Sequence, residues 1–199
     1  MGEGRCEELS AARSSRYLTS HISHLPSPIH VATPSPGRKL LRLWTRLSQF
    51  PGGKWLFSKL FGRMVPYSGS VGPRIVHLEP GHARVEIPDR RSNRNHLGSV
   101  HALALMNVCE MTSGLAMMAG LPDDVRGIVT SMSIEYYKKA RGTITAVSRV
   151  EVPTVTTDID FAVTADCLDP DAVVVARATI TWRLGPVKVA VTRGPRTRG

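Results

Sequence analysis

The fold of this 199-residue chain is decided by residues 95–120, which read NHLGSVHALALMNVCEMTSGLAMMAG. A turn that contains Gly and Ser leads into about twenty almost wholly apolar residues, in which the helix-favouring Ala, Leu and Met dominate. A helix that is apolar nearly all round is expected to be buried. One carboxylate, Glu110, interrupts this helix, and a buried carboxylate needs a hydrogen bond, an ion pair or a function.

The segments on either side of this helix alternate with the twofold period of β-strands. Before the helix, Ile75–Leu78 and Ala83–Ile87 flank a Glu-Pro-Gly-His turn and predict a β-hairpin. After the helix, further strands are predicted at residues 127–137, 143–150, 159–167 and 173–182. One long buried helix among six antiparallel strands predicts an α+β fold, in which a single sheet curls round the helix over residues 64–184.

The positive charge of the chain lies at its two ends. Residues 1–78 hold eleven basic and three acidic residues, residues 79–182 hold ten and thirteen, and residues 183–199 hold five and none. A nucleic-acid-binding domain carries the basic patch on its folded core, so no nucleic-acid partner is expected. The basic ends can still contact anionic membranes or acidic partners.

Both ends are also unlike the core in composition. Residues 1–37 are rich in Ser, Pro, Arg and His and are predicted to be a disordered or targeting extension, and residues 185–199 form a basic tail. No Asp or Glu occurs from Ser10 to Leu78, as in mitochondrial transit peptides, whereas three glutamates before Ser10 argue against such a peptide. We expect an intracellular protein, cytoplasmic or mitochondrial.

Residues 38–63 are predicted to form an amphipathic helical segment with a break at Pro51–Gly53. Apolar residues such as Leu40 and Trp44 recur there at helical spacing between basic residues. Two interpretations remain open. The helices pack on the domain, or residues 38–62 present a basic amphipathic surface that makes peripheral contact with a membrane.

The three cysteines, Cys6, Cys109 and Cys167, are far apart in the sequence. They form neither a Cys-x-x-Cys pair nor a Cys/His cluster with metal-ligand spacing, so no disulfide framework, metal or cofactor is predicted. A reducing compartment is therefore expected. No uninterrupted apolar stretch reaches the roughly 18 residues of a transmembrane span.

Several short motifs resemble those of a known family. They are Asn95–His101 followed by Glu110, together with Pro66-Tyr67, Leu78–Gly81 and Ile134–Gly142. On these motifs, residues 64–184 resemble a hotdog-fold protein, in which a long antiparallel sheet wraps a central helix. Within that superfamily the chain resembles the phenylacetate-type acyl-CoA thioesterases and, more closely, the branch known as domain of unknown function 4442.

The resemblance implies a site at the start of the central helix. In the thioesterases an Asn precedes a His-Gly-Gly, and an Asp or Glu follows. Asn95, His101 and Glu110 keep the family's spacings of six and nine residues, whereas Ala102 and Leu103 replace the two glycines. In the family the backbone N–H after the His polarises the thioester carbonyl. Ala102 retains that N–H, although its Cβ takes space that Gly leaves open.

The resemblance implies hydrolysis of an acyl thioester to free acid and CoA. The helix start offers unpaired N–H groups and a partial positive charge, so the Ala102 N–H, with its neighbours, is the predicted oxyanion hole. Glu110 is predicted to act as a general base on water or as a nucleophile. Asn95 is expected to position water or the carbonyl, and His101 to orient the thioester. Capping or turn roles for His101 and Asn95, and a structural role for Glu110, are the alternatives.

Further substrate contacts are predicted at Gly98, in the turn, and at a hydroxyl of Thr130 or Ser131. A basic hairpin end is predicted either to hold the CoA phosphates or simply to be solvated. Its residues are Lys138, Lys139 and Arg141. Cys109 is interpreted as a small buried residue rather than a nucleophile.

Helix geometry places the predicted site between subunits. His101 and Glu110 are two and a half turns apart, so on one helix they face opposite sides and differ by about 13 Å in height. One chain cannot place both residues on the same thioester, which predicts a homodimer or a homotetramer. Asn107, Glu110 and Ser113 fall on one helical stripe, which suits a polar seam between subunits.

The predicted function is therefore an acyl-CoA thioesterase that works without a metal or redox cofactor. The alternative is a hotdog protein that binds acyl-CoA or lipid without catalysis. Hydration of an enoyl thioester is less favoured, because no Asp/His hydratase motif is apparent in the sequence.

Overall fold

The computed structural model describes residues 35–187. The predicted extension, residues 1–37, and the predicted basic tail, residues 185–199, lie largely outside them. Three helices precede the sheet, namely α1 (Pro36–Leu47), α2 (Gly53–Met64) and α3 (Pro66–Gly69). The predicted N-terminal helices are thus confirmed, and Gly52, with a φ of 78°, occupies the break between α1 and α2.

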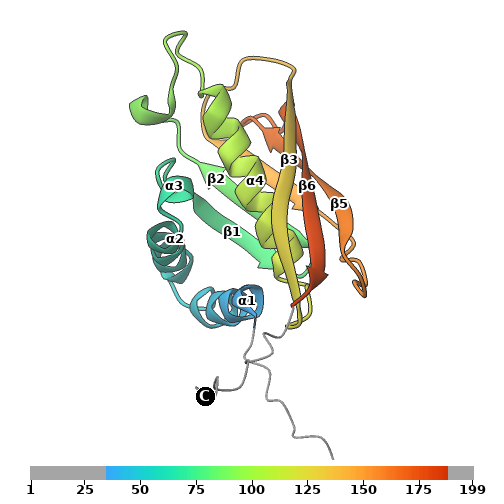
Figure 1. Ribbon diagram of the computed structural model, residues 1–199. Coiled ribbons are helices and arrows are strands. Elements are labelled where there is room, and N and C mark those ends of the chain that lie inside the picture. Colours follow the sequence, from blue (N-terminus) through green and yellow to red (C-terminus); the bar gives the residue numbers. More distant parts are fainter. Residues whose placement is uncertain (1–34, 188–199) are drawn as a thin grey trace, which may run out of the picture. The chain divides into compact units, whose positions relative to one another are not determined.

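Six strands form one antiparallel sheet beside the long helix α4 (Ala102–Met118). They are β1 (Arg74–Glu79), β2 (His82–Ile87), β3 (Val125–Tyr136), β4 (Ile144–Arg149), β5 (Ile159–Leu168) and β6 (Val174–Pro186). Their order across the sheet is β1-β2-β4-β5-β6-β3. Figure 1 shows α4 against one face of the sheet, which confirms the predicted α+β architecture.

Helix α4 is buried because its surface and the sheet face beneath it are both apolar. Val108, Ala116 and Met117 of α4 have no exposed surface, and the same holds for Ala83 and Val85 of β2. Burying each large apolar side chain contributes about 1.5–3 kcal/mol. The first turn of α4 departs from the predicted burial of the helix. Leu103 is 64% exposed, so the rest of the described chain does not cover the helix start.

Strand β3 forms one edge of the sheet, because within residues 35–187 it pairs only with β6. Its register with β6 places Met132 and Tyr136 on the face that carries α4. Both side chains remain about half exposed. An apolar strand edge of this kind is a surface on which a second chain can pair.

Helices α1 and α2 pack on the domain. Trp44 of α1 is buried, and its ring meets Phe57 of α2 edge-on with centroids 5.1 Å apart. Phe50 in the α1–α2 connection and Trp55 in the first turn of α2 are nevertheless largely exposed. No helix within residues 35–187 is both long enough and apolar enough to cross a bilayer.

Two cysteines that are distant in the sequence meet in the core. The Sγ atoms of Cys109 on α4 and Cys167 on β5 lie 3.3 Å apart, and both residues are fully buried free thiols. Cys109 is therefore a small core residue, as predicted. Its contact with Cys167 was not predicted, because a separation of 58 residues leaves no local pattern in the sequence.

Candidate active site

Glu110 lies in the middle of α4 between two apolar cavities. One, the α1-side cavity, has a volume of about 290 Å³ and is bounded by helices α1 to α4 and by Trp182 of β6. The other, the β3-side cavity, has a volume of about 450 Å³ and is bounded by α3, α4 and β3. Glu110, Val65 and Ser68 line both cavities, so the carboxyl group stands where the two cavities adjoin.

The Glu110 carboxyl group has no compensating partner. Within residues 35–187 it makes no hydrogen bond and no ion pair, and it is only partly exposed. Burial among apolar side chains raises its pKa above the ordinary value. A carboxylate kept in this state is a stronger base than a solvated one, as acid–base catalysis requires.

The first turn of α4 leaves one backbone donor free. The Leu103 N–H donates to His101 Nδ1 over 3.1 Å, and the Ala104 and Leu105 N–H groups donate to the His101 carbonyl over 2.9 and 3.1 Å. Within the described residues the Ala102 N–H donates to no group, and Ala102 is exposed. The predicted oxyanion donor is therefore available. The prediction that neighbouring N–H groups assist it is wrong, because they are already bonded.

His101 is the N-cap of α4. Its Nδ1 accepts the Leu103 N–H, so that nitrogen cannot also contact a thioester. His101 therefore acts as a helix cap in this chain, because its side chain accepts one of the N–H groups that a helix start leaves unpaired.

Replacement of His101 tests this role. His101→Ala should lower the unfolding free energy by about 1 kcal/mol, because the cap is lost, and the melting temperature by about 2–4 °C. His101→Asn should retain most of the stability, because Asn caps well. Thermal unfolding and the thioester assay described below are measured on both variants. A rate lost equally in the Ala and Asn variants, with stability retained in the latter, would assign the imidazole to the substrate instead.

Asn95 and Gly98 shape the loop before α4. Asn95 Oδ1 accepts the N–H groups of Leu97 and Ser99 over 3.0 and 3.1 Å. Gly98 has a φ of 68°, a backbone conformation that side chains with a Cβ rarely adopt. The side-chain oxygen of Asn95 therefore stabilises the turn, which is the alternative role considered for this residue. Neither residue lines the cavities beside Glu110 in the same chain.

The predicted hydroxyl donors on β3 are not directed at Glu110. A bulge interrupts the register between Val129 and Ser131, and the Thr130 hydroxyl donates to the Thr181 carbonyl over 3.3 Å. Because of the bulge, Val129 and Met132 line the β3-side cavity, whereas Thr130 and Ser131 do not. A single-residue shift of this kind reverses which side chains face the helix.

The basic hairpin end lies near the start of α4. Lys138, Lys139 and Arg141 line an open hollow, and the Ala140 carbonyl accepts the Val100 N–H over 2.8 Å. Lys138 Nζ already pairs with Asp169 at 2.6 Å. Lys139 and Arg141 form no ion pair within the described residues.

Two polar groups near Glu110 were not predicted as site residues. Asn107 donates through Nδ2 to the Tyr67 carbonyl over 3.3 Å, but its buried Oδ1 has no partner in residues 35–187. The buried Trp182 Nε1, beside the α1-side cavity, has none either. The polar stripe on α4 is only partly correct, because Ser113 is fully buried and donates to the Glu110 backbone carbonyl.

Comparison with known protein families gives a match for this chain. The family described as "Domain of unknown function (DUF4442)" matches residues 53–184, which is well over half of the chain. The chain belongs to this family. A search of curated proteins finds no match.

Solved structures similar to this DUF4442 chain include three informative cases. The genomics target APC5556 is 31% identical, with a TM-score of 0.65 over 75% of this chain and 98% of that one. PA5026 from Pseudomonas aeruginosa, described as a probable thioesterase, is 22% identical, with a TM-score of 0.60 over 69% and 97%. A thioesterase family protein from Silicibacter pomeroyi is 19% identical, with a TM-score of 0.56 over 65% and 96%. The predicted hotdog fold is confirmed.

Proposed function

We propose that this chain is a homodimeric hotdog thioesterase that hydrolyses an acyl-CoA to the free acid and CoA. The observation that carries the proposal is the presence on α4 of both a backbone donor and a carboxyl group that are available to a substrate. Within residues 35–187 these are the Ala102 N–H, which donates to no group, and the Glu110 carboxyl group, which has no hydrogen-bond or ion-pair partner. Solved proteins of this fold that are described as thioesterases support the same reaction class.

The proposed reaction uses each group once. The thioester carbonyl oxygen accepts the Ala102 N–H, next to the positive end of the α4 dipole, and negative charge develops on that oxygen. Glu110 removes a proton from water, whose oxygen attacks the carbonyl carbon. The carbon–sulfur bond then breaks, and the CoA thiolate takes the proton back from Glu110. Direct attack by the Glu110 carboxylate, through an anhydride, is the second form of this mechanism.

The two groups belong to different subunits in this proposal. Along one α4 they are about 12 Å apart, from a rise of 1.5 Å per residue. An antiparallel second copy, paired through β3, brings the helix start of one chain to the Glu110 of the other. The exposed Leu103, Met132 and Tyr136 are the apolar surface that such pairing covers. Asn107 Oδ1, which has no partner within residues 35–187, lies in the same region.

Disruption of this surface tests the dimer. Met132→Glu should convert the dimer to monomer, because a charge would be buried unpaired between apolar surfaces. Sedimentation velocity measures the assembly, and CoA release should fall at least about tenfold with it, because the site needs both chains. Thr179→Glu, on the opposite face of the neighbouring strand, is the control and should remain dimeric. A fully active Met132→Glu monomer would show that one chain contains the whole site.

The surroundings of the site fit the two ends of an acyl-CoA. Lys139 and Arg141, near the helix start, have no ion pair in the described part of the chain and offer cations for the CoA phosphates. The α1-side and β3-side cavities, lined mainly by apolar side chains, offer space for the acyl group. In this chain α1 supplies Pro36, Gly37 and Leu40 to the α1-side cavity, although α1 precedes the segment matched by the family.

A specific observation supports the non-catalytic alternative. Leu103 stands where the related thioesterases have Gly, and it lines the β3-side cavity beside the helix start. A side chain there takes space from a thioester. In this alternative the chain binds acyl-CoA or lipid without turnover, and the exposed Phe50 and Trp55 assist contact with a membrane surface.

The deciding experiment measures release of free CoA from a panel of short, medium, long and aryl acyl-CoAs. The proposal predicts multiple turnovers with at least one of them. Binding of the same acyl-CoAs by calorimetry, without release of CoA, would favour the non-catalytic alternative. Leu103→Gly should then create or increase turnover, because it restores the glycine of the related thioesterases.

A further inference from the structure

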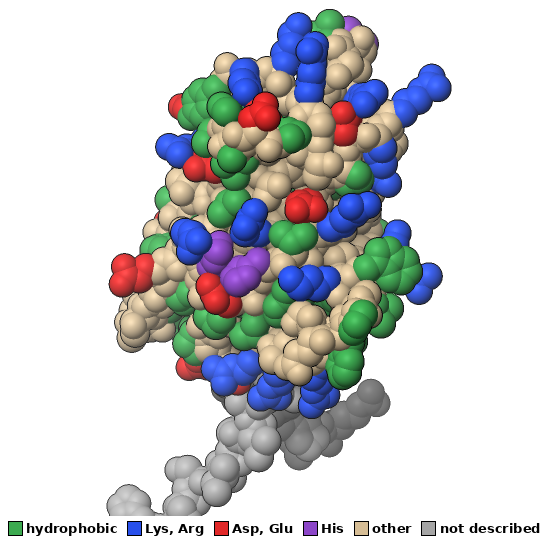
Figure 2. All heavy atoms as spheres, turned by 180° about the vertical axis from the view of Figure 1, so that it is seen from behind, with side chains coloured by type: hydrophobic (Ala, Val, Ile, Leu, Met, Phe, Trp, Pro, Cys, Tyr) green, Lys and Arg blue, Asp and Glu red, His purple; other side chains and the backbone are tan. Residues whose placement is uncertain are grey.

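Three polar side chains with metal-ligand chemistry meet on the outer face of the sheet. His77, Glu79 and His82 belong to the β1–β2 hairpin, and their register places them on the face opposite the buried Leu78 and Ala83. Figure 2 shows histidine side chains gathered on the molecular surface behind the view of Figure 1. His77 and Glu79 are two residues apart on β1 and share a face of the strand. Glu79 and His82 are cross-strand partners beside the Pro80–Gly81 turn.

The hairpin holds these side chains in a fixed arrangement. Gly81 has a φ of 78°, which a turn with Pro before it requires, and the Gly81 N–H donates to the Ala116 carbonyl of α4 over 2.9 Å. His82 is only 8% exposed although it lies on the outer face. A rigid turn and a buried ring reduce the entropy that ligand side chains lose when they bind an ion.

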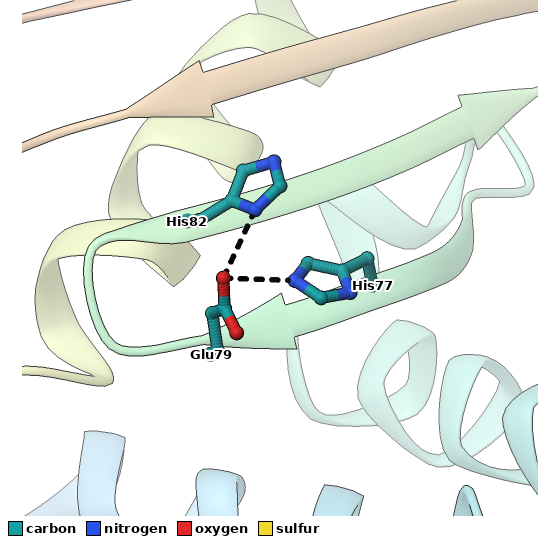
Figure 3. A group of neighbouring side chains, drawn as sticks. All are labelled: His77, Glu79 and His82. Carbon is teal, nitrogen blue, oxygen red and sulfur yellow. Dashed lines mark hydrogen bonds and ion pairs between the residues drawn. The ribbon is translucent and has the colours of Figure 1, made fainter.

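Two of the distances between the ligand atoms are compatible with a shared metal ion. Glu79 Oε1 lies 3.3 Å from His77 Nε2 and 3.2 Å from His82 Nδ1, as drawn in Figure 3. All three ligand atoms lie within 4.8 Å of one another. In a tetrahedral site with bonds of about 2.0–2.1 Å, neighbouring ligand atoms are about 3.3 Å apart. The two contacts with Glu79 therefore match two edges of such a tetrahedron.

Hydrogen bonding satisfies His82 Nδ1, which bonds Glu79 Oε1 over 3.2 Å, but within residues 35–187 it satisfies neither His77 Nε2 nor His82 Nε2. Within the described residues His77 Nε2 is buried and has no hydrogen-bond partner, although Glu79 Oε1 lies 3.3 Å away. Buried polar atoms are rarely left without a partner. A metal ion between the three ligand atoms would give His77 Nε2 a partner, because the ion accepts the lone pair of that nitrogen.

We propose that His77 Nε2, Glu79 and His82 Nδ1 bind one divalent transition-metal ion of the zinc type, with water completing the coordination. Two imidazoles and one carboxylate form a ligand set that suits zinc. The ion would clamp the edge hairpin β1–β2. Because α4 lies on the opposite face of the sheet, this site is separate from Glu110 and does not depend on the proposed thioesterase activity.

Nearby cations set the expected strength of binding. Arg84 is the cross-strand partner of His77, and Arg149 is that of His82. Their positive charges oppose a divalent ion, so we expect a dissociation constant in the micromolar range rather than a permanently occupied site. Arg149→Gln should tighten binding severalfold, because it removes one of these charges.

The test uses the full chain without an affinity tag, freed of metal by a chelator. Zinc is titrated against a chromogenic chelator, and cobalt is added separately to record the visible absorption of a tetrahedral site. We expect one bound ion per chain that is weakened at least about tenfold in His77→Ala, His82→Ala and Glu79→Gln. The exposed His96 supplies the matched control, and His96→Ala should bind as the wild type does.

Thermal unfolding separates metal binding from misfolding of a variant. Free zinc at about 100 times the dissociation constant should raise the melting temperature of the wild type by at least about 5 °C. The same zinc should leave Glu79→Gln nearly unchanged, and that variant keeps both imidazoles and a side chain of the same size. The proposal is overturned by the absence of a one-to-one binding phase, and equally by unchanged affinity in these variants.

Discussion

Glu110→Gln should abolish most of the thioesterase activity. We expect kcat for CoA release to fall by about 10²–10⁴-fold, because the variant lacks the base that activates water. KM should change by less than about threefold, because Gln has the shape of Glu and the lost interaction acts in the transition state. Glu86→Gln, a half-buried carboxylate on β2, is the matched control and should keep the wild-type rate. Turnover that survives Glu110→Gln unchanged would refute the mechanism.

The same substitution should stabilise the folded chain, which a purely structural carboxylate would not do. Burial raises the pKa of Glu110, so in the folded state the charged form is disfavoured and stability falls as pH rises from the ordinary value of 4.5 through the raised one. Gln removes this cost. At pH 7 we expect a gain of about 1 kcal/mol, seen as a higher melting temperature, and the gain should disappear below pH 4.5.

The wild-type rate should depend on pH in the opposite sense to stability, because catalysis needs the ionised form of Glu110 and stability favours the neutral form. Glu110 acts as a base only when it is ionised, so kcat should decline as pH falls through the raised pKa of this carboxyl group. The decline should be absent from the residual activity of Glu110→Gln.

Ala102→Pro should remove the oxyanion donor without damage to the fold. Ala102 is the first residue of α4, a position that favours Pro, and its N–H has no partner within the described residues. His101 has φ −65° and ψ 140°, which are compatible with a following Pro. We expect kcat to fall by about 10²–10³-fold, with an unfolding free energy within about 0.5 kcal/mol of the wild type.

Ala102→Ser and Ala102→Gly are the controls, since both keep the N–H and should stay active. The chain itself accepts Pro at the first position of α1 and of α3, at Pro36 and Pro66. A Pro variant that is folded and fully active would exclude the Ala102 N–H from catalysis.

A mixture of the two inactive variants tests whether the site is shared between chains. In a heterodimer of Ala102→Pro with Glu110→Gln, one composite site keeps both wild-type groups and the other loses both. After subunit exchange, a 1:1 mixture should recover about a quarter of the wild-type activity, because half of the dimers are heterodimers with one intact site. No recovery in such a mixture, with exchange verified by mass-tagged chains, would place both groups within one chain.

The candidate site was predictable only in part. The spacing of Asn95, His101 and Glu110 located the region, because it places a loop, a helix start and a carboxylate in order along the chain. The roles were less predictable. The His101 Nδ1 capping bond occupies the Leu103 N–H at the start of α4. The spacing of residues along the sequence does not predict such a side-chain orientation. Thr130 and Ser131 do not line the β3-side cavity of their own chain, because the bulge beside Ser131 depends on the pairing with β6.

Local patterns in the sequence were enough to predict the order of the elements, the apolar character of α4 and the isolation of Glu110 on it. These properties follow from the period and chemistry of neighbouring residues, which act over a few positions along the chain. The three-dimensional arrangement was needed to show that β3 pairs with β6 and forms an edge of the described sheet. It was also needed to show that Cys109 meets Cys167, and that His77, Glu79 and His82 come together on the outer face. Strand order, register and side-chain burial are set by contacts between distant segments, and these contacts exist only once the sheet has closed over α4.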